Sequence, residues 1–322
     1  MLKTSLAGFS PVMNRRLLDA LEGKNQGPPP VWMMRQAGRA LPEYRKIREK
    51  RPLHDLFHSP KEIIQITRMP VDSLGVDAAI LFSDILIPLE ALGYTLRYES
   101  GKTPSAHKTT PNLFDISQVD YVFEAISKMD LDVPLIGFAG GPYTVATYVE
   151  KEPSDALLDQ ITEITIEYLK AQIKAGANVL QIFDSWASKD FTRAHPRLKK
   201  IFYSLQDEET PLIIFCRNTS DHLEDLIALN PSAISCDWKE PLHLSRKRIP
   251  KRIACQGNLD PTALLKPQEE LLREVETLLF SMKEDPAYIF NLGHGVLPDT
   301  PVSNLQAVVQ KVQESPAIAK AK

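Results

Sequence analysis

The 322-residue chain has few cysteines, no long apolar run and little net charge. Its three cysteines, Cys216, Cys236 and Cys255, have no paired spacing, so we expect buried, reduced thiols in a cytoplasmic protein. No apolar stretch reaches the roughly 18 residues that a membrane-spanning helix needs, and no signal peptide is apparent, so we expect neither membrane insertion nor export. A net charge of −3 predicts no general nucleic-acid-binding surface, and any anion site must be a local group of arginines.

The remaining composition is typical of a globular protein. Hydrophobic residues make up 43% of the chain and charged residues 25%, which is enough for a sizeable core. We find no internal repeat, no low-complexity tract and no Gly/Ser linker. We therefore predict a single domain over residues 1–322, with an N-terminal helical arm at about 1–27 that carries a short helix around 14–21.

Eight short apolar runs alternate with segments that have helical signals. The alternation predicts a parallel sheet, and eight units over this length favour a closed (β/α)8 barrel, or TIM barrel, over an open sheet. The predicted strands are 31–34, 78–82, 135–139, 179–183, 212–215, 233–236, 253–255 and 288–292. The clearest predicted helices are 59–75, 154–175, 190–205, 220–229, 267–282 and 302–312, and residues 93–98 form an extended excursion.

The segment 28–39 combines an apolar run with two arginines. Three prolines precede the run, Arg35 follows it directly, and Arg39 comes four residues later across a permissive Ala37-Gly38. Two guanidinium groups on one short loop can clamp carboxylates or phosphates. The alternative is that both arginines pair with surface acids such as Glu43.

Polar residues follow the other predicted strands, at the end of a barrel where active sites lie. These positions are Arg35, Asp84, Gly140, Gly141, Ser185, Arg217, Asp237, Asn258 and His294. Asp84 has apolar neighbours on both sides, and burying a carboxylate is costly without donors. It either accepts N–H groups of a ligand and stabilises positive charge there, or caps a neighbouring loop.

Three further residues are candidates for ligand contact. Tyr148 follows Thr144 by about one helical turn, so its hydroxyl could point into the mouth of the barrel. Ser185 lacks the G-x-S-x-G elbow of a hydrolase nucleophile, so it either binds substrate or caps the helix before Asp190. His294 lies between two glycines, which favours a ligand contact. The other histidines form no recognised zinc motif, and we predict no metal site.

Taken together, these segments resemble the uroporphyrinogen decarboxylase family from about residue 13 to 312. The motifs that carry the resemblance are PPVWMMRQAGR with LPEYR after it, LFSDIL, GGPYTVATY, LQIFDSWA, QGNLDP and FNLGHGVLPDTP. The resemblance implies a (β/α)8 barrel that forms a homodimer and works without metal or organic cofactor. It also implies conversion of the four acetate side chains of uroporphyrinogen III to methyls, giving coproporphyrinogen III and carbon dioxide in haem biosynthesis.

The same resemblance implies a set of site residues. Asp84 and Arg35 are implied as catalytic residues. The implied substrate-binding residues are Arg35, Gln36, Ala37, Gly38, Arg39, Asp84, Tyr148, Ser185 and His294.

Two other functions compete with this interpretation. A zinc-dependent cobalamin or thiol methyltransferase of the same superfamily needs His-x-Cys, but Ile234 and Ile253 stand two residues before Cys236 and Cys255. A non-catalytic tetrapyrrole-binding protein is the second alternative. Asp84 argues against it, because binding a polyanion gives no reason to bury a negative charge.

Overall fold

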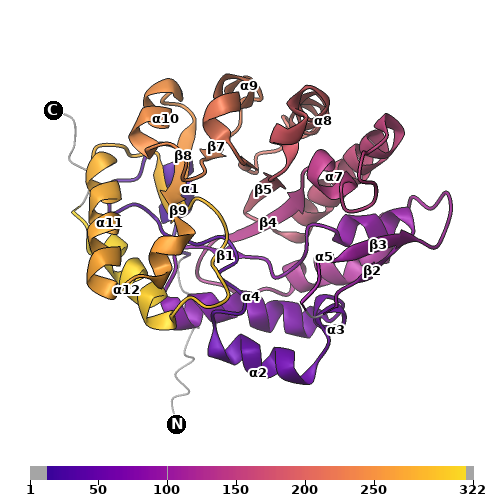
Figure 1. Cartoon of the computed structure of the whole chain (residues 1–322), viewed down its shortest axis with the longest axis horizontal. Helices are drawn as coiled ribbons and strands as arrows, with labels where there is room; N and C mark the ends of the chain where they lie inside the picture. The colour runs from indigo at the N-terminus through magenta and orange to yellow at the C-terminus, as the bar shows by residue number, and fades with distance from the viewer. Residues whose placement is uncertain (1–12, 100, 317–322) are drawn as a thin grey trace, which may run out of the picture.

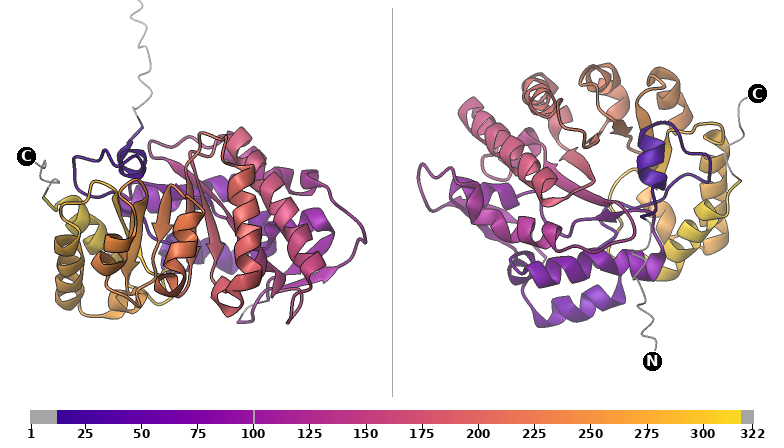
Figure 2. Two further views of the ribbon diagram at one scale, coloured as in Figure 1. Left: turned by 90° about the horizontal axis from the view of Figure 1, so that it is seen from above. Right: turned by 180° about the vertical axis from the view of Figure 1, so that it is seen from behind.

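A computed structural model of the chain describes residues 13–99 and 101–316, and its centre is a parallel sheet of seven strands. Strands that are neighbours in the sheet follow one another in order along the chain, and the helices surround them (Figures 1 and 2). This arrangement confirms seven of the eight predicted strands and their parallel pairing. The strands are β1 (Ala79–Ile80), β4 (Leu135–Gly140), β5 (Val179–Asp184), β6 (Leu212–Cys216), β7 (Ala233–Ser235), β8 (Ala254–Leu259) and β9 (Tyr288–Leu292).

The predicted first strand, 31–34, is wrong as a regular strand. Val31 forms only an isolated parallel bridge with Phe290. The Phe290 N–H donates to the Pro30 carbonyl (2.9 Å), and on the other side the Asp77 N–H donates to the Val31 carbonyl (2.8 Å). Residues 30–32 therefore lie between β9 and β1 and bond to both. The pairing stops early because Arg35 has a left-handed backbone (φ 61°), which turns the chain away from the sheet.

The helices lie where the sequence predicts them, with additional short ones between. They are α1 (Arg16–Leu21), α2 (Pro42–Lys50), α3 (Leu53–Phe57), α4 (Pro60–Leu74), α5 (Asp120–Ser127), α6 (Pro142–Ala146), α7 (Asp155–Ala175), α8 (Phe191–Ser204), α9 (Leu223–Ala228), α10 (Leu242–Arg248), α11 (Gln268–Ser281) and α12 (Val302–Gln313). Five 3-10 helices join them: η1 (Ile87–Leu92), η2 (Ile116–Val119), η3 (Ala187–Lys189), η4 (Thr219–His222) and η5 (Pro261–Leu265). No helix among the described residues is long and apolar enough to cross a membrane.

Local sequence signals explain several helix boundaries. The Ser154 side chain accepts the Leu157 N–H at the start of α7, and Gly176 ends that helix with φ 114°. Ser59 precedes α4 as predicted, but its side chain makes no capping bond in the described structure. The predicted excursion at 93–98 is the first strand of a hairpin, β2 (Tyr94–Arg97) with β3 (Ser105–Lys108).

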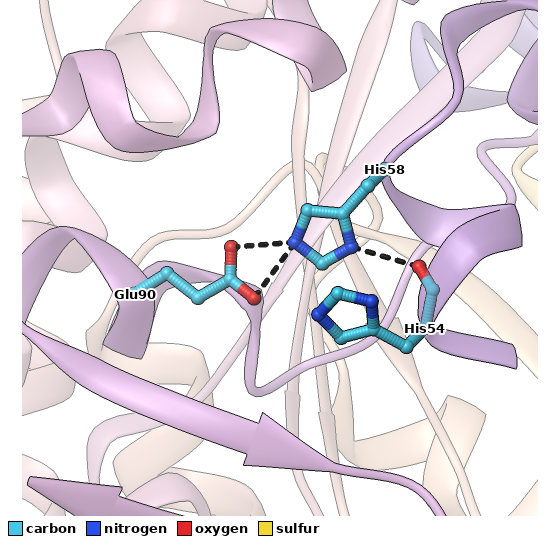
Figure 3. A group of neighbouring side chains, drawn as sticks. All are labelled: His54, His58 and Glu90. Carbon is cyan, nitrogen blue, oxygen red and sulfur yellow. Dashed lines mark hydrogen bonds and ion pairs between the residues drawn. The ribbon is translucent and has the colours of Figure 1, made fainter. Parts of the chain in front are cut away.

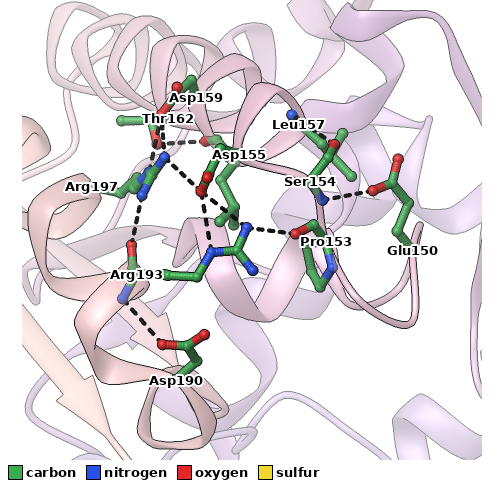
Figure 4. A network of polar contacts seen from close by, with 11 residues as sticks. Glu150, Pro153, Ser154, Asp155, Leu157, Asp159, Thr162, Asp190, Arg193 and Arg197 are labelled. Carbon is green, nitrogen blue, oxygen red and sulfur yellow. Dashed lines mark hydrogen bonds and ion pairs between the residues drawn. The ribbon is translucent and has the colours of Figure 1, made fainter.

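A charged network joins the N-terminal turns of α7 and α8 and fixes the segment after Tyr148 (Figure 4). Arg193 contacts the Pro153 carbonyl (2.6 Å) and the Asp155 carboxylate (3.0 Å). Arg197 reaches the same carboxylate (3.1 Å). One acid thus accepts from two guanidinium groups, which holds the two helices in register beside the mouth of the barrel.

The interior of the barrel contains a chain of polar side chains instead of apolar ones alone. The Trp32 indole N–H donates to Gln256 Oε1 (3.0 Å), and Gln256 Nε2 donates to Ser235 (2.9 Å) and Gln181 (3.2 Å). All four residues are fully buried. These bonds tie residue 32 to β5, β7 and β8.

Asp77 is the polar residue that holds the segment between β9 and β1. Its side chain is 2% exposed, accepts the Val31 N–H (3.0 Å), and also accepts from Asn14 (2.9 Å), Arg16 (3.3 Å) and Gln313 (3.3 Å). A buried carboxylate with four donors is well compensated, and three of the donors belong to segments N-terminal to β1, whereas Gln313 belongs to α12.

We expect Asp77→Ala to lower the free energy of unfolding by about 3 kcal/mol, because it leaves the buried Val31 N–H without an acceptor and removes the partner of Arg16. Urea denaturation followed by circular dichroism measures the change. Asp72→Ala is the matched control, because that side chain is 57% exposed. Its effect should stay within about 0.5 kcal/mol. Equal losses in the two variants would contradict the proposed role of Asp77.

Candidate active site

Arg35 occupies the mouth of the barrel in a geometry that depends on Gly295. A Cβ atom at Gly295 would lie 2.4 Å from Arg35 Cδ, so only glycine leaves room for the arginine side chain. The Val296 N–H donates to the Met34 carbonyl (2.8 Å), which holds the two loops together. Arg35 is exposed and makes no ion pair with a described residue. Its guanidinium is therefore available to an anionic ligand.

The residues after Arg35 divide into supporting and exposed positions. Gln36 is fully buried: it accepts the Met33 N–H (2.9 Å) and donates to the Ala78 carbonyl (2.9 Å), which ties the loop to the start of β1. Ala37 and Gly38 are half-buried. Arg39 is exposed and, like Arg35, forms no ion pair with Glu43 or any other described acid. The predicted alternative of surface pairing is therefore wrong for both arginines.

Asp84 lies just beyond β1 and faces Arg35. One carboxylate oxygen accepts the Leu86 N–H (2.9 Å). Burial raises the pKa of Asp84, while the Leu86 N–H, the positive charge of Arg35 and the neighbouring Tyr98 hydroxyl oppose the rise. The carboxylate has acceptor capacity left for a donor from a ligand.

Tyr148 lies beside this pair, and Ser185 precedes Trp186, on which the Tyr148 ring stacks. The Tyr148 ring stacks on Trp186 at 5.2 Å and 11°. Burial and the charge of Asp84 raise the pKa of Tyr148, and the charge of Arg35 opposes the shift. The tyrosine therefore lies close to both charged groups. Ser185 is half-buried next to Trp186 and does not cap α8, because the Asp190 side chain accepts the Arg193 N–H there.

His294 completes the group from the loop after β9. Burial lowers its pKa to about 4, and the positive charges of Arg35 and Arg217 add to the shift. The imidazole is therefore neutral at pH 7. Its ring packs edge-on against Phe215 (5.9 Å) and Trp238 (6.2 Å), which fixes its orientation in the mouth.

The sequence did not indicate the role of Asp184, which is fully buried at the end of β5. Its Oδ1 accepts both the N–H (2.9 Å) and the hydroxyl (2.5 Å) of Thr144, whose Oγ1 accepts the Trp186 N–H (2.9 Å). Burial raises the pKa of Asp184 to about 6. A Cβ atom at Gly141 would lie 2.2 Å from this carboxylate. The absence of a side chain at Gly141 therefore allows the close approach of Asp184. The Gly140-Gly141 pair was the feature of the sequence that could have indicated this contact.

Other polar residues at the strand ends hold loops. Asp237 accepts the Asn218 N–H (2.7 Å), and Asn258 donates to the carbonyls of Asp237 and Glu240 (2.8 Å each). Arg217 is half-buried without an ion pair to a described residue. Among the described residues, no group of three or more potential metal ligands contains a cysteine.

Comparisons with known sequences agree on one family. The family description "Uroporphyrinogen decarboxylase (URO-D)" matches residues 13–315. The uroporphyrinogen decarboxylase of Protochlamydia amoebophila is 40% identical over 95% of this chain and 93% of its own length. That of Desulfotalea psychrophila is 40% identical over 94% of this chain and 99% of its own.

Solved structures share the architecture at lower identity. A methyltransferase from Methanosarcina mazei has a TM-score of 0.76 at 21% identity and covers 94% of this chain and 99% of its own. A B12-independent methionine synthase from a Shewanella species has a TM-score of 0.59 at 11% identity, covering 95% and 97%. At these identities the likeness establishes the barrel fold alone.

We expect the Cε1–H signal of His294 to titrate near pH 4 in an NMR experiment, with the signal assigned from its loss in His294→Asn. Arg35→Met should raise the midpoint toward the ordinary value of about 6.5, because it removes a neighbouring positive charge. Arg273→Met, which changes a 71% exposed arginine on α11, should leave it unchanged. A midpoint that does not respond to Arg35→Met would contradict the proximity of the two groups.

The same shift has a consequence for stability. Because the folded state holds His294 neutral, the unfolded state binds more protons between about pH 4 and pH 6.5. The wild-type protein should lose stability relative to His294→Asn as pH falls through this window. Urea denaturation of both proteins at pH 7 and pH 5 measures the difference. An equal loss in the two proteins would contradict the shift.

Proposed function

This chain belongs to the uroporphyrinogen decarboxylase family, carboxy-lyases of porphyrin biosynthesis, and we propose that Asp84 and Arg35 carry its reaction at the mouth of the barrel. The substrate is uroporphyrinogen III, and each of its four acetate side chains becomes a methyl, giving coproporphyrinogen III. One observation supports the assignment above the others. An arginine without an ion pair to a described residue lies beside the Asp84 carboxylate, and the same arginine is close enough to Tyr148 and His294 to influence the pKa of each.

Substrate binding depends on local positive charge. Uroporphyrinogen carries eight carboxylates, and a chain with a net charge of −3 offers no general attraction for them. Arg35 and Arg39 are exposed and unpaired with described residues, so each can present two parallel N–H donors to a carboxylate. Arg217 supplies a third positive charge close to His294.

Decarboxylation requires a group that accepts the electron pair left behind when carbon dioxide departs. Protonation of a pyrrole ring carbon next to the acetate-bearing carbon makes the ring a cation. The bond between the acetate methylene and its carboxylate then breaks, carbon dioxide leaves, and the bonding pair neutralises the ring. A second proton adds to the methylene to give the methyl, and the first proton is lost from the ring carbon. The substrate is thus its own electron sink, which is why we propose a reaction without a cofactor.

Asp84 stabilises the cationic ring in this scheme. Its Oδ1 is held by the Leu86 N–H, which fixes the carboxylate, and we propose that the carboxylate accepts pyrrole N–H groups of the substrate. The partly buried carboxylate is poorly solvated, and its negative charge acts more strongly on a developing positive charge than it would in water. A fixed charge costs no reorganisation when the ring is protonated.

The remaining residues of the site bind the substrate or hold the loop that carries the arginines. Gln36 holds the arginine loop against β1, and Ala37 and Gly38 give the substrate access to the backbone of that loop. Tyr148, Ser185 and neutral His294 offer hydrogen bonds to the macrocycle and its side chains. The ring proton comes from Arg35 or from a water molecule that it binds. A guanidinium group is a poor acid, so we favour the water molecule as the donor of the ring proton.

We also propose that the protein acts as a cytoplasmic homodimer. The support for both statements is the family resemblance of the whole chain. Light scattering coupled to size-exclusion chromatography measures the mass in solution, and a monomer would contradict the dimer.

We expect anaerobic incubation with uroporphyrinogen III to give products with seven, six, five and four carboxyl groups, unaffected by EDTA. Asp84→Asn preserves shape but removes the charge, and it should lower kcat by about 10²–10³-fold. Arg35→Met should lower kcat and raise KM, because it loses both the bidentate contact and the charge. Chromatography of the oxidised products by carboxyl number measures both effects.

Asp72→Asn is the matched control for Asp84→Asn, because its carboxylate is 57% exposed and lies in α4. It should retain wild-type kcat. Full activity of Asp84→Asn, or activity that disappears with EDTA, would contradict the proposed mechanism.

A further inference from the structure

A second group of side chains, on α3 and η1, has the composition of a transition-metal site (Figure 3). It consists of His54, His58 and Glu90, and one ligand atom of each lies within 4.8 Å of the others. We propose that these three residues bind a zinc ion. The group does not include any residue assigned above to the decarboxylation site, so this inference is independent of the proposed mechanism.

Two of the ligands already lie close to the separation that zinc requires. His58 Nε2 is 3.0 Å from both oxygens of Glu90. Bonds of about 2.0–2.1 Å in a tetrahedral site place neighbouring N and O ligands roughly 3.3 Å apart, so an ion can replace the proton that now joins imidazole and carboxylate.

His54, in α3, supplies the third ligand. It lies one turn before His58, which follows the last residue of α3, and its ring stacks on that of His58 at 4.0 Å and 21°. Its side chain is 48% exposed, whereas those of His58 and Glu90 are 27% and 13% exposed. His54 can therefore rotate toward an ion held by the other two residues, and the exposed side leaves the fourth position to water.

Groups outside the three ligands orient them. The His58 Nδ1–H donates a hydrogen bond to the His54 carbonyl (2.8 Å), which leaves Nε2 as the coordinating atom. The Tyr121 hydroxyl donates to Glu90 Oε2 (2.8 Å) and fixes the carboxylate. Such outer contacts are typical of metal sites, where they set the tautomer of the histidine and the direction of the acid.

The donor set selects the class of ion. Two imidazole nitrogens and one carboxylate match zinc and its neighbours in the transition series, whereas calcium and magnesium prefer oxygen ligands alone. This site departs from the sequence-based expectation of no metal site, because Glu90 lies 32 residues beyond His58 and no histidine spacing indicates that the two meet.

The alternative is an ion pair between His58 and Glu90 that joins α3 to η1 without a metal. His54 distinguishes the two, because the ion pair does not use its imidazole and the zinc site does. His54→Ala should also leave folding undisturbed, because this side chain is 48% exposed. It is therefore the decisive substitution.

The experiment uses the full chain after removal of metal with a chelator and dialysis. Zinc is titrated in competition with a chromophoric chelator, which gives stoichiometry and affinity, and cobalt is used to detect tetrahedral coordination by its visible absorption. We expect one zinc ion per chain and a rise in Tm of roughly 3 °C or more at saturating zinc. His54→Ala and Glu90→Gln should each weaken binding on the order of 100-fold, and Tyr121→Phe about tenfold.

His243→Ala is the matched control, since His243 is an exposed histidine on α10 outside the group. It should bind zinc as the wild type does. Absence of a stoichiometric site in the wild type, or affinity that is unchanged in His54→Ala, would overturn the proposal. Loss of zinc binding in His243→Ala would overturn it as well.

Discussion

The barrel and its site depend on the backbone bonds that residues 30–32 make to both β9 and β1. Phe290 donates to Pro30 on one side, and Asp77 donates to Val31 on the other. A parallel sheet with two free edges would leave rows of buried N–H and C=O groups unpaired, at a substantial cost each. Residues 30–32 pair with groups at both edges and so avoid part of this cost, and the Asp77 side chain accepts the Val31 N–H in addition. Because the pairing ends so soon, the chain is free to turn outward at Arg35.

The outward turn places one positive charge among several titratable groups. Arg35 opposes the upward pKa shifts of Asp84 and Tyr148 and contributes to the downward shift of His294. A carboxylate that would otherwise be costly to bury is thereby kept next to a cation, and a histidine is kept neutral. Gly295 makes this possible, because any side chain there would occupy the path of the arginine. The electrostatics of the site therefore follow from a steric requirement in the loop after β9.

Many polar residues near the mouth stabilise it without facing a ligand. Asp184 and Gln36 are completely buried, and their bonds connect loops to strands. These two side chains hold the loops rigidly because no other hydrogen-bond partners are available to them among the described residues. A buried carboxylate or amide that loses its partners destabilises the protein. Such a frame already orders the backbone that carries the exposed arginines, so only their side chains would have to be ordered when they bind the carboxylates of the proposed substrate.

The sequence by itself determined the alternating strands and helices, the ends of α7, and the strand-end position of Asp84 and His294. These features depend on burial and backbone preferences that neighbouring residues encode. Only the tertiary structure decided that 31–34 pairs so briefly, that Gln36 points inward, and that Glu90 meets His58. Each of these outcomes depends on contacts between segments far apart in the chain. Closure of the barrel sets their distances, and no local pattern specifies them.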